Sequence, residues 1–549
     1  MDFSDIRYNR FRLRLQVYFF TPYFFVLKRR NITYINFLMS RGGTFRLITS
    51  TGIQDRLIYA NDLLRQNIRK IMARKVGKLM SKNHRLRNKD DVYETMRPQS
   101  WLPSLDKLGK THIFLVRGSF KPFVAIGYEY YKTGNTGGNP KLGDRGIKFT
   151  LWQNSDFFSD AVIHIRLKGL RATSNLDKVR YVAFPGHRIV KELRFKVNNN
   201  PIDAINSDDY NAHYNFHVPP GKKDGWKRCM GQEIPYMGHV TPNPALDEFR
   251  EYRWIGNGNQ TFKREHGIVD LWIPILFWFR DFKCAFPQLV VPSMQTVFEL
   301  DLESANNMIS YANYGGGGKY IEPSIVTCDL YLNRMFVLEE MRDIFLKSFG
   351  FSLMRVHLRH KKILKNDKGS VLLNEIKWPT EVLYIGFRPR VNITNSQNWY
   401  RNMRLTAVDM PTPVVITLPD IDTTRNVMKI NNVRYYEETP VVESIEIKAH
   451  DITLYRDSPG MFYTGYIPYR FGKFMNTPED LGWFMVPFNT LTGEYQPSGH
   501  LNVSKTRELY IKYVGDFISP DNSTDLVVLG QCINFLIIKD GDAALKFVS

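Results

Sequence analysis

Cysteine is scarce in this chain of 549 residues, which has only four, and no two of them form a CxxC pair. Structural zinc sites and dense disulfide frameworks both need closely spaced cysteines, so the sequence excludes both kinds of scaffold. A free cysteine in a folded domain behaves as a small apolar side chain. We therefore predict reduced, buried thiols in a cytoplasmic protein at Cys229, Cys284, Cys328 and Cys532.

Long apolar runs are also missing. The most apolar stretch, residues 15–27, is interrupted by Pro22 and is shorter than the roughly 20 residues that a membrane-spanning helix needs. It does not fit a signal peptide, because it lacks a small-residue cleavage site and is followed at once by Lys28, Arg29 and Arg30. The mean hydropathy of -0.32 indicates a soluble protein, and a hydrophobic fraction of 43% supplies ample core.

Catalytic and cofactor motifs are absent as well. The chain has no HExxH, no GxSxG and no compact acidic cluster with metal-ligand spacing. The run YGGGGKY from Tyr314 fails as a phosphate-binding loop, because Asn313 and Tyr320 stand where the motif requires Gly and Ser or Thr. A flexible interdomain linker is the better interpretation of these glycines. We therefore expect no catalytic, cofactor-binding or metal-binding residue and no enzymatic activity.

Two segments contain histidines or aromatic residues in patterns that could bind a metal ion or nucleic-acid bases. His213 and His217 lie in AHYNFHV, which alternates like a strand and would place both on one face without supplying further metal ligands. The run LWIPILFWFRDF from Leu271, with Arg280, suggests either a platform for stacked bases or a strand buried on both faces. Its nearly continuous apolarity favours the buried strand.

Positive charge is abundant, since 75 Lys and Arg against 54 Asp and Glu give +21 at pH 7. Such a balance suggests an acidic partner. The run NDLLRQNIRKIMARKVGKLM from Asn61 has the spacing of an amphipathic helix whose second face is basic. That face could contact phosphates or lipid headgroups, or could be the solvated side of a packed helix. Its basic residues, the candidate inner-surface contacts, are Arg65, Arg69, Lys70, Arg74, Lys75 and Lys78.

Beyond about residue 108 the chain consists of short β-rich runs separated by Gly, Pro, Asn and Asp clusters, which is typical of antiparallel sandwiches. The first series includes AVIHIRLKG from 161, KELRFKV from 191 and TVFELDL from 296. The second includes FSLMRVHLRH from 351, VESIEIKAHDITLY from 442 and ELYIKYV from 508. Gly315–Gly318 and a helix expected over 337–348 divide them, so the sequence predicts two stacked sandwiches.

Several longer blocks carry a more specific signal than any short motif. They include RGGTFRLITSTGIQDRLIYANDLL from 41, PGHRIVKELRFKVNNNPID from 185, LWIPILFWFRDFKCAFPQLVVP from 271, IKWPTEVLYIGFRPRVNI from 376 and YQPSGHLNVSKTRELYI from 495. These blocks resemble the major capsid proteins of African swine fever virus and related large DNA viruses, and they are collinear with that family over nearly everything after Met39. In the last block, Pro497 and Gly499 suit a type I turn that leads into a strand with Leu501 and Val503 on one face.

The resemblance implies an all-β fold, a double jelly roll of two eight-stranded antiparallel sandwiches behind a short helical and basic N-terminal base region. The expected parts are an N-terminal extension over 1–38, with Met39 as the alternative initiator, the base region over 39–107, a first jelly roll over 108–305, a linker and helix over 306–348, and a second jelly roll over 349–549. The loop at 233–271 looks shorter than in the family, and the basic block at 65–89 looks longer.

The resemblance also implies a structural role in the icosahedral capsid of the virion, assembled in the host cytoplasm. Its expected partners are two further copies in a homotrimer, neighbouring capsomers, minor capsid and penton proteins, the inner viral membrane and a viral folding chaperone, with no specific nucleic acid and no cofactor. The rival interpretations are a basic nucleic-acid-binding protein and a glycan-binding β-sandwich.

Overall fold

The computed structural model describes residues 126–152, 154–240, 251–291, 295–315, 318–339, 342–343, 351–409, 414–417, 427–430, 434–450, 452–472, 475–506, 508–539 and 542–547. Contacts divide the chain into two compact units, 1–110 and 111–549, and all described residues belong to the second. The predicted extension, the base region and the basic helix at 61–80 lie outside the described residues. No described helix is long and apolar enough to cross a membrane.

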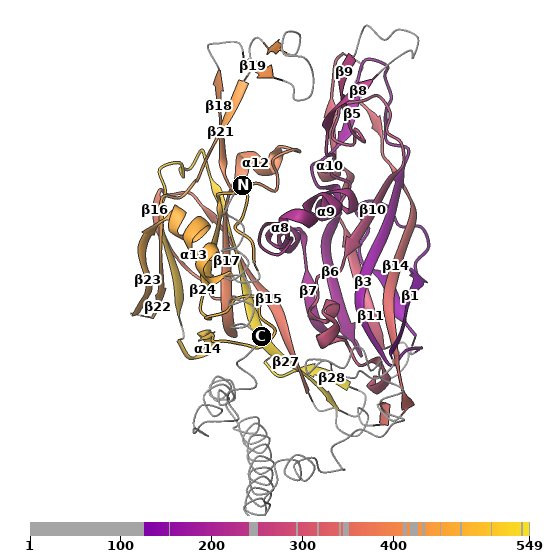
Figure 1. Cartoon of the computed structure of the whole chain (residues 1–549), viewed down its shortest axis with the longest axis vertical. Coiled ribbons are helices and arrows are strands. Elements are labelled where there is room, and N and C mark those ends of the chain that lie inside the picture. Colours follow the sequence, from indigo (N-terminus) through magenta and orange to yellow (C-terminus); the bar gives the residue numbers. More distant parts are fainter. Residues whose placement is uncertain are drawn as a thin grey trace, which may run out of the picture. The chain divides into compact units, whose positions relative to one another are not determined.

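The first half of the second unit is a sandwich of two four-stranded antiparallel sheets (Figure 1). One sheet has the order β1 (Ile126–Gly134), β14 (Ser324–Val337), β3 (Phe157–Lys168), β10 (Val269–Pro274). The other has the order β2 (Ile147–Leu151), β11 (Thr296–Leu302), β6 (Val190–Val197), β7 (Asn200–Ile205).

The second half repeats this arrangement. One sheet has the order β15 (Phe351–Leu364), β27 (Thr524–Lys539), β17 (Pro379–Pro389), β24 (Trp483–Pro487), and the other has β16 (Lys368–Leu372), β26 (Leu509–Val514), β22 (Ser444–Ala449), β23 (Ile452–Pro459). When the eight main strands of each half are numbered along the chain, both halves have sheets of order 1-8-3-6 and 2-7-4-5. The predicted double jelly roll is confirmed.

The short strands pair as β4 (Arg171–Ala172) with β13 (Tyr320–Ile321), β5 (Lys178–Tyr181) with β12 (Ile309–Ala312), β8 (Tyr236–Val240) with β9 (Glu251–Ile255), β18 (Arg404–Asp409) with β21 (Arg434–Thr439), and β19 (Val414–Thr417) with β20 (Val427–Ile430). Two more extend the large sheet of the second jelly roll, where β25 (Leu501–Asn502) pairs with β17 and β28 (Asp542–Leu545) with β27.

Short helices and helical turns fill the connections. The first jelly roll has α7 (Pro185–Ile189), α8 (Ser207–Phe216), η4 (Pro220–Lys222), α9 (Lys223–Cys229), η5 (Trp278–Arg280), η6 (Phe282–Cys284), η7 (Gln288–Val290) and α10 (Ala305–Met308). The second has α12 (Arg390–Thr394), the π-helical turn η8 (Phe462–Tyr466), α13 (Ile467–Phe471) and α14 (Val503–Thr506).

Alternation of apolar and polar residues builds each core, because successive strand residues point to opposite faces of a sheet. In β6, Leu193, Phe195 and Val197 point inward and are fully buried. The Phe195 ring lies 5.0 Å from Phe298 and 6.3 Å from Phe158, measured between centroids, and Phe158 comes from the opposite sheet. Aromatic rings from both sheets therefore lock the first sandwich together.

The domain boundary predicted at residue 305 is wrong. Strand β14 (324–337) pairs with both β1 and β3, so it is the last strand of the first jelly roll rather than part of a linker. Gly315 and Gly318, both with positive φ, stand in the connection between β12 and β13 inside that jelly roll. Of the helix predicted over 337–348, the described residues 339, 342 and 343 are helical.

Three local predictions are also wrong. The run from Leu271 is a strand only to Pro274 and continues as η5 and η6; β10 buries alternate residues, so it is not covered on both faces. AHYNFHV is helical, because His213 belongs to α8 and His217 caps it. The segment after Gly499 makes only the two-residue strand β25, and Val503 begins α14.

The predicted free thiols are confirmed, since all four cysteines are unpaired. Cys328 and Cys532 are buried, whereas Cys229 and Cys284 are half-buried. Burial raises the pKa of the Cys532 thiol to about 12. A thiol held in its protonated form is a poor nucleophile, so Cys532 serves as packing.

Candidate assembly surfaces

The contact between the two jelly rolls is centred on helix α8, and the local sequence explains why a helix starts there. The side chain of Asn206 accepts hydrogen bonds from the backbone N–H groups of Asp208 and Asp209 at 2.9 and 3.3 Å. In return, Asp209 Oδ2 accepts one from the Asn206 N–H at 2.7 Å. This reciprocal capping box satisfies N–H groups that a helix start otherwise leaves without partners.

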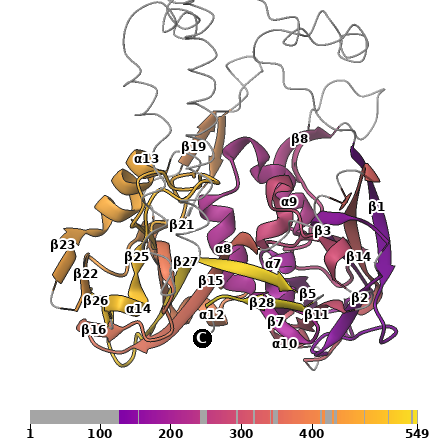
Figure 2. The same ribbon diagram turned by 90° about the horizontal axis from the view of Figure 1, so that it is seen from below.

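Helix α8 lies between the two jelly rolls (Figures 1 and 2). On the first jelly roll, the Tyr210 hydroxyl donates to Pro274 O at 2.9 Å. On the second, the Phe216 ring lies 4.8 Å from Tyr384 and 6.2 Å from Trp483, measured between centroids. All eleven residues of β17, which carries Tyr384, are buried. Strand β17 is thus covered on its outer face as well as its inner one.

Two ion pairs join the acidic first turn of α8 to strands of the second jelly roll. Arg388 Nη1 donates to Asp208 Oδ1 at 2.8 Å, and Arg359 Nε donates to Asp209 Oδ2 at 2.8 Å. Arg359 also donates to Ala204 O. Burial opposes ionisation of Asp208, but the charges of Arg388 and Lys361 prevail and lower its pKa. Asp208 therefore remains a carboxylate within the contact.

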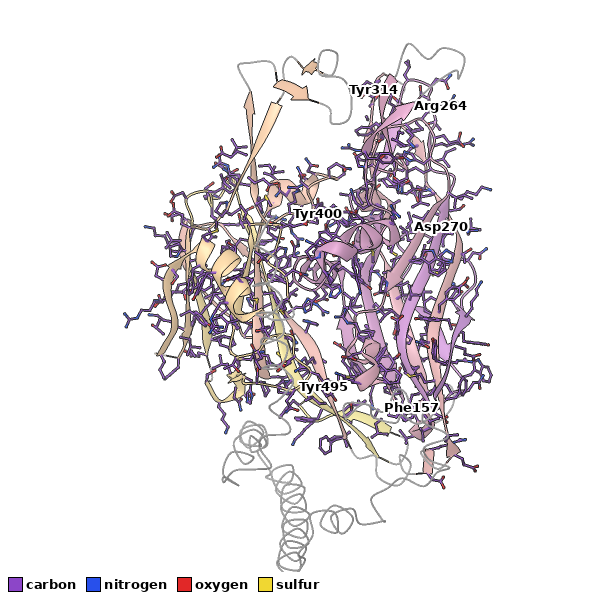
Figure 3. All side chains as sticks on the ribbon, in the orientation of Figure 1. Phe157, Arg264, Asp270, Tyr314, Tyr400 and Tyr495 are labelled. Atoms are coloured by element: carbon purple, nitrogen blue, oxygen red, sulfur yellow. The ribbon has the colours of Figure 1, made fainter. Side chains whose placement is uncertain are left out.

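Further hydrogen bonds cross the same contact. Trp399 Nε1 donates to Ala183 O at 2.7 Å, and Asn476 Nδ2 donates to Val218 O at 2.7 Å. Lys223, which is itself buried, pairs with Glu479 at 2.7 Å. Figure 3 shows Tyr400 in this region between the jelly rolls, where its ring lies 4.9 Å from Phe184. Helix, strands and loops of both halves thus share one polar and aromatic junction.

A cavity of about 180 Å³ lies in this junction. Its lining includes His213 and His217, stacked with centroids 5.0 Å apart, together with His357, Arg280 and Arg355. Burial lowers the pKa of His217 to about 3 and lowers the pKa values of His213 and His357, so these imidazoles are neutral at pH 7. Arg280 Nη1 lies 3.1 Å from His213 Nε2, a contact that only a neutral imidazole can accept.

The described part of the chain contains no group of three or more His, Cys, Asp or Glu side chains arranged to hold a metal ion. The candidate basic residues Arg65, Arg69, Lys70, Arg74, Lys75 and Lys78 lie outside the described residues. The sequence did not single out the junction pairs formed by Asp208, Asp209, Arg359 and Arg388. The sequence does contain a signal for the helix that carries the two aspartates, because Asn206 followed by Asp208 and Asp209 is a helix N-capping pattern.

The comparisons with known proteins match this architecture. A family model described as large eukaryotic DNA virus major capsid protein matches residues 379–544, within the second jelly roll. The hexon protein p72 of African swine fever virus is 26% identical over 663 aligned positions, which cover 93% of this chain and 100% of the relative. The predicted resemblance is confirmed. A major capsid protein from a second isolate of that virus matches equally well.

Solved structures of capsid proteins are similar to this chain in three dimensions as well. The Faustovirus major capsid protein superposes with a TM-score of 0.65 at 27% identity, covering 89% of this chain and all of that one. A chain of the PBCV-1 virus capsid superposes with a TM-score of 0.56 at 15% identity, covering 79% of this chain and all of that one. The second likeness concerns the fold alone. Both support the double jelly roll.

Removing Arg388 tests the junction. We expect Arg388→Ala to destabilise the protein by about 3–5 kcal/mol, because Asp208 would remain buried without its main partner. Scanning calorimetry should show a lower unfolding temperature, and Asp208→Asn in the same chain should restore much of it. Lys512→Ala is the matched control: Lys512 pairs with Glu446 at 3.7 Å, but the two side chains are 44% and 21% exposed, so the loss should stay below about 1 kcal/mol. Equal losses would contradict a special role for the buried pair.

The junction histidines predict a pH dependence. The pKa values of His213 and His217 in the folded protein lie below the ordinary 6.5. Below pH 6.5 the unfolded chain therefore binds protons that the folded protein does not. The stability that is fully present above pH 6.5 is lost as the pH falls toward the folded pKa values. By pH 5 the loss reaches up to about 2 kcal/mol per histidine. The double variant His213→Gln/His217→Gln should therefore lose less thermal stability than the wild type between pH 7.5 and 5.

Burial raises the pKa of Asp203 to about 8, which makes the protein more stable as the pH falls through this window. The prediction is therefore tested by the difference in unfolding temperature between the variant and the wild type at each pH, and not by the wild-type pH dependence alone. His450→Gln, at an exposed position, serves as the control for replacing a histidine outside the junction. A double variant that matches the wild type at both pH values would refute the prediction.

Proposed function

We propose that this chain is a major capsid protein of a large DNA virus, which assembles as a homotrimer into pseudo-hexagonal capsomers of the icosahedral outer shell. The single observation that carries the proposal is the duplicated jelly roll, two sandwiches of identical strand order fixed against each other by a buried junction. The likeness to viral capsid proteins over 93% of the chain supports the same role. This role is structural rather than enzymatic.

Three such subunits would place six similar jelly rolls around one axis. A tile with a nearly sixfold outline packs into a lattice, while its own threefold contacts stay closed and specific. One gene product can then cover a large surface. A subunit whose jelly rolls moved freely could not present a constant outline, so the rigid junction suits this role.

Charge distribution favours the capsid role over general nucleic-acid binding. Residues 1–110 hold 23 Lys and Arg against 8 Asp and Glu, so they carry +15 of the chain's +21. Residues 111–549, which form both jelly rolls, carry only the remaining +6. A protein that bound nucleic acid through its sandwiches would be expected to concentrate charge on them.

The basic N-terminal unit is proposed to face inward in the virion, toward the inner viral membrane or minor capsid proteins. Anionic lipid attracts basic segments by about 1 kcal/mol per Lys or Arg near the surface. Penton proteins and a viral folding chaperone complete the proposed set of partners, and assembly would take place in the host cytoplasm.

Reversing charges in the basic N-terminal unit tests whether this unit faces the inner membrane. Glu in place of Arg69, Lys70, Arg74 and Lys75 should weaken binding to phosphatidylserine vesicles at least tenfold in a flotation assay, because favourable charge becomes repulsive. Glu in place of the exposed Lys362 and Lys365 of the second jelly roll is the control and should have a much smaller effect. Unchanged vesicle binding by the four-residue variant would contradict the proposal that the basic N-terminal unit faces the inner membrane.

Solution mass tests the capsomer. Chains begun at Met1 and at Met39, produced in eukaryotic cells with the viral chaperone, should each form a single species in light scattering. The Met1 species should have about three times the 64.2 kDa chain mass and a hexagonal outline in negative stain. A well-folded monomer at micromolar concentration would overturn the capsomer proposal.

A further inference from the structure

The duplicated topology makes the contact inside the chain a template for a contact between chains. In the first jelly roll, α8 belongs to the connection between the fifth and sixth main strands, β7 and β10. It lies on the outer face of the sheet β15, β27, β17, β24 of the second jelly roll, where Phe216 meets Tyr384. In the second jelly roll, the equivalent connection, from β23 to β24, contains η8 and α13.

The segment formed by η8 and α13 packs on its own jelly roll with one side only. There, Tyr463 is fully buried and its hydroxyl donates to Ile445 O at 3.2 Å, and Ile467 is 2% exposed. The other side carries large exposed side chains: Tyr466 is 52% and Tyr469 82% exposed, and Met461, directly before η8, is 70% exposed. Helix α8 by contrast is buried on both sides, because the second jelly roll covers it.

The sheet equivalent to the one that α8 covers is β1, β14, β3, β10 of the first jelly roll, and its outer face points away from the second jelly roll (Figures 1 and 2). Trp272 stacks on His164 with centroids 4.1 Å apart and lies 5.2 Å from Tyr331. Trp272 is 37% and Tyr130 55% exposed. An aromatic patch of this kind on an otherwise well-packed sheet marks an interaction surface.

Both surfaces carry charged side chains. The sheet face carries Asp160, Asp270 and Asp329 together with Lys132, Arg166 and Lys168, so its acids and bases are equal in number. Figure 3 places Asp270 on this outward side. The helical segment and the end of β23 carry exposed Arg456 and Arg470 against Asp457. Inside the chain the charges are arranged differently, because the acids Asp208 and Asp209 lie on the helix and their arginines on the sheet.

We infer that the η8 and α13 segment of one copy docks on the outer face of the sheet β1, β14, β3, β10 of a second copy of this chain. The inference rests on the proposed trimeric capsomer and identifies the surfaces that close it. Each copy offers one helical segment and one sheet face, so the contact is head-to-tail, and three such contacts would close the ring of the proposed trimer. Around that ring, contacts through α8 within a chain alternate with contacts through α13 between chains.

Two single-surface variants test the contact. Tyr466→Asp/Tyr469→Asp disables the helical segment, and Trp272→Asp disables the sheet face. Each variant should need at least a tenfold higher concentration than the wild type to form trimers in native mass spectrometry. Tyr236→Asp on β8, where the side chain is 59% exposed, is the control and should leave the trimer intact. Because the changed helix residues are mostly exposed, the unfolding temperature should stay close to that of the wild type.

Mixing the two variants distinguishes this head-to-tail contact from a symmetric one. The sheet-face variant retains a working helical segment and the helix variant retains a working face, so one good contact can form between them. A one-to-one pair should therefore appear in the mixture but in neither variant alone, and closed trimers should not. If either variant misfolds, Tyr469→Ser or Trp272→Ala replaces it.

The outcomes separate this inference from the proposed function. If the wild type is trimeric and the variants remain equally trimeric, the docking surfaces are wrong while the capsomer stands. A monomeric wild type would overturn the capsomer proposal and the inference with it. Pair formation only in the mixture would establish the contact.

Discussion

The buried contact of helix α8 with the second jelly roll is the constraint on which the rest of the molecule depends. Two domains on one chain are by default free to move relative to each other, and only a large, specific interface removes that freedom. Here the aromatic contact of Phe216 with Tyr384 supplies apolar burial. The ion pairs of Asp208 with Arg388 and of Asp209 with Arg359 fix the orientation of the helix against the second jelly roll. Buried ion pairs add little net stability, but a misplaced one is costly, so they select one register between the two halves.

Both aspartates owe their position to the start of the helix. A negative charge in the first turn of a helix is favourable because N–H groups there point toward it, and the Asn206 capping box fixes where that turn begins. The same local sequence thus starts the helix and presents its carboxylates to the arginines of β15 and β17. Three neutral histidines border the junction and add no positive charge to it at neutral pH.

Strands were predictable where only one face of a sheet is buried, because alternation then survives in the sequence, as in β6, β11 and β26. Helix α8 was not, because it is buried on nearly every side and so lacks an apolar stripe with helical period. Its end, AHYNFHV, alternates by coincidence. The boundary at 305 failed because the glycines at 315–318 look like a linker, whereas pairing of β14 with β1 spans about 200 residues. Such a pairing leaves no local signal. Likewise, Arg359 and Arg388 are single charges within apolar strands, and only the fold reveals the acids that they meet.

Joining two copies of one topology in a single chain gives two chemically different versions of the same helix-on-sheet contact. Contacts within a chain form at any concentration, whereas contacts between chains depend on concentration. If both contacts had the same charges, the α13 segment of a neighbouring copy could compete with α8 for the sheet β15, β27, β17, β24. On that sheet, Arg470 of α13 and the nearby Arg456 would meet Arg359 and Arg388, which pair with the acids of α8, so the wrong pairing brings like charges together. In the proposed ring, this repulsion favours α8 of the same chain on that sheet, while the shared topology keeps the jelly rolls nearly equivalent.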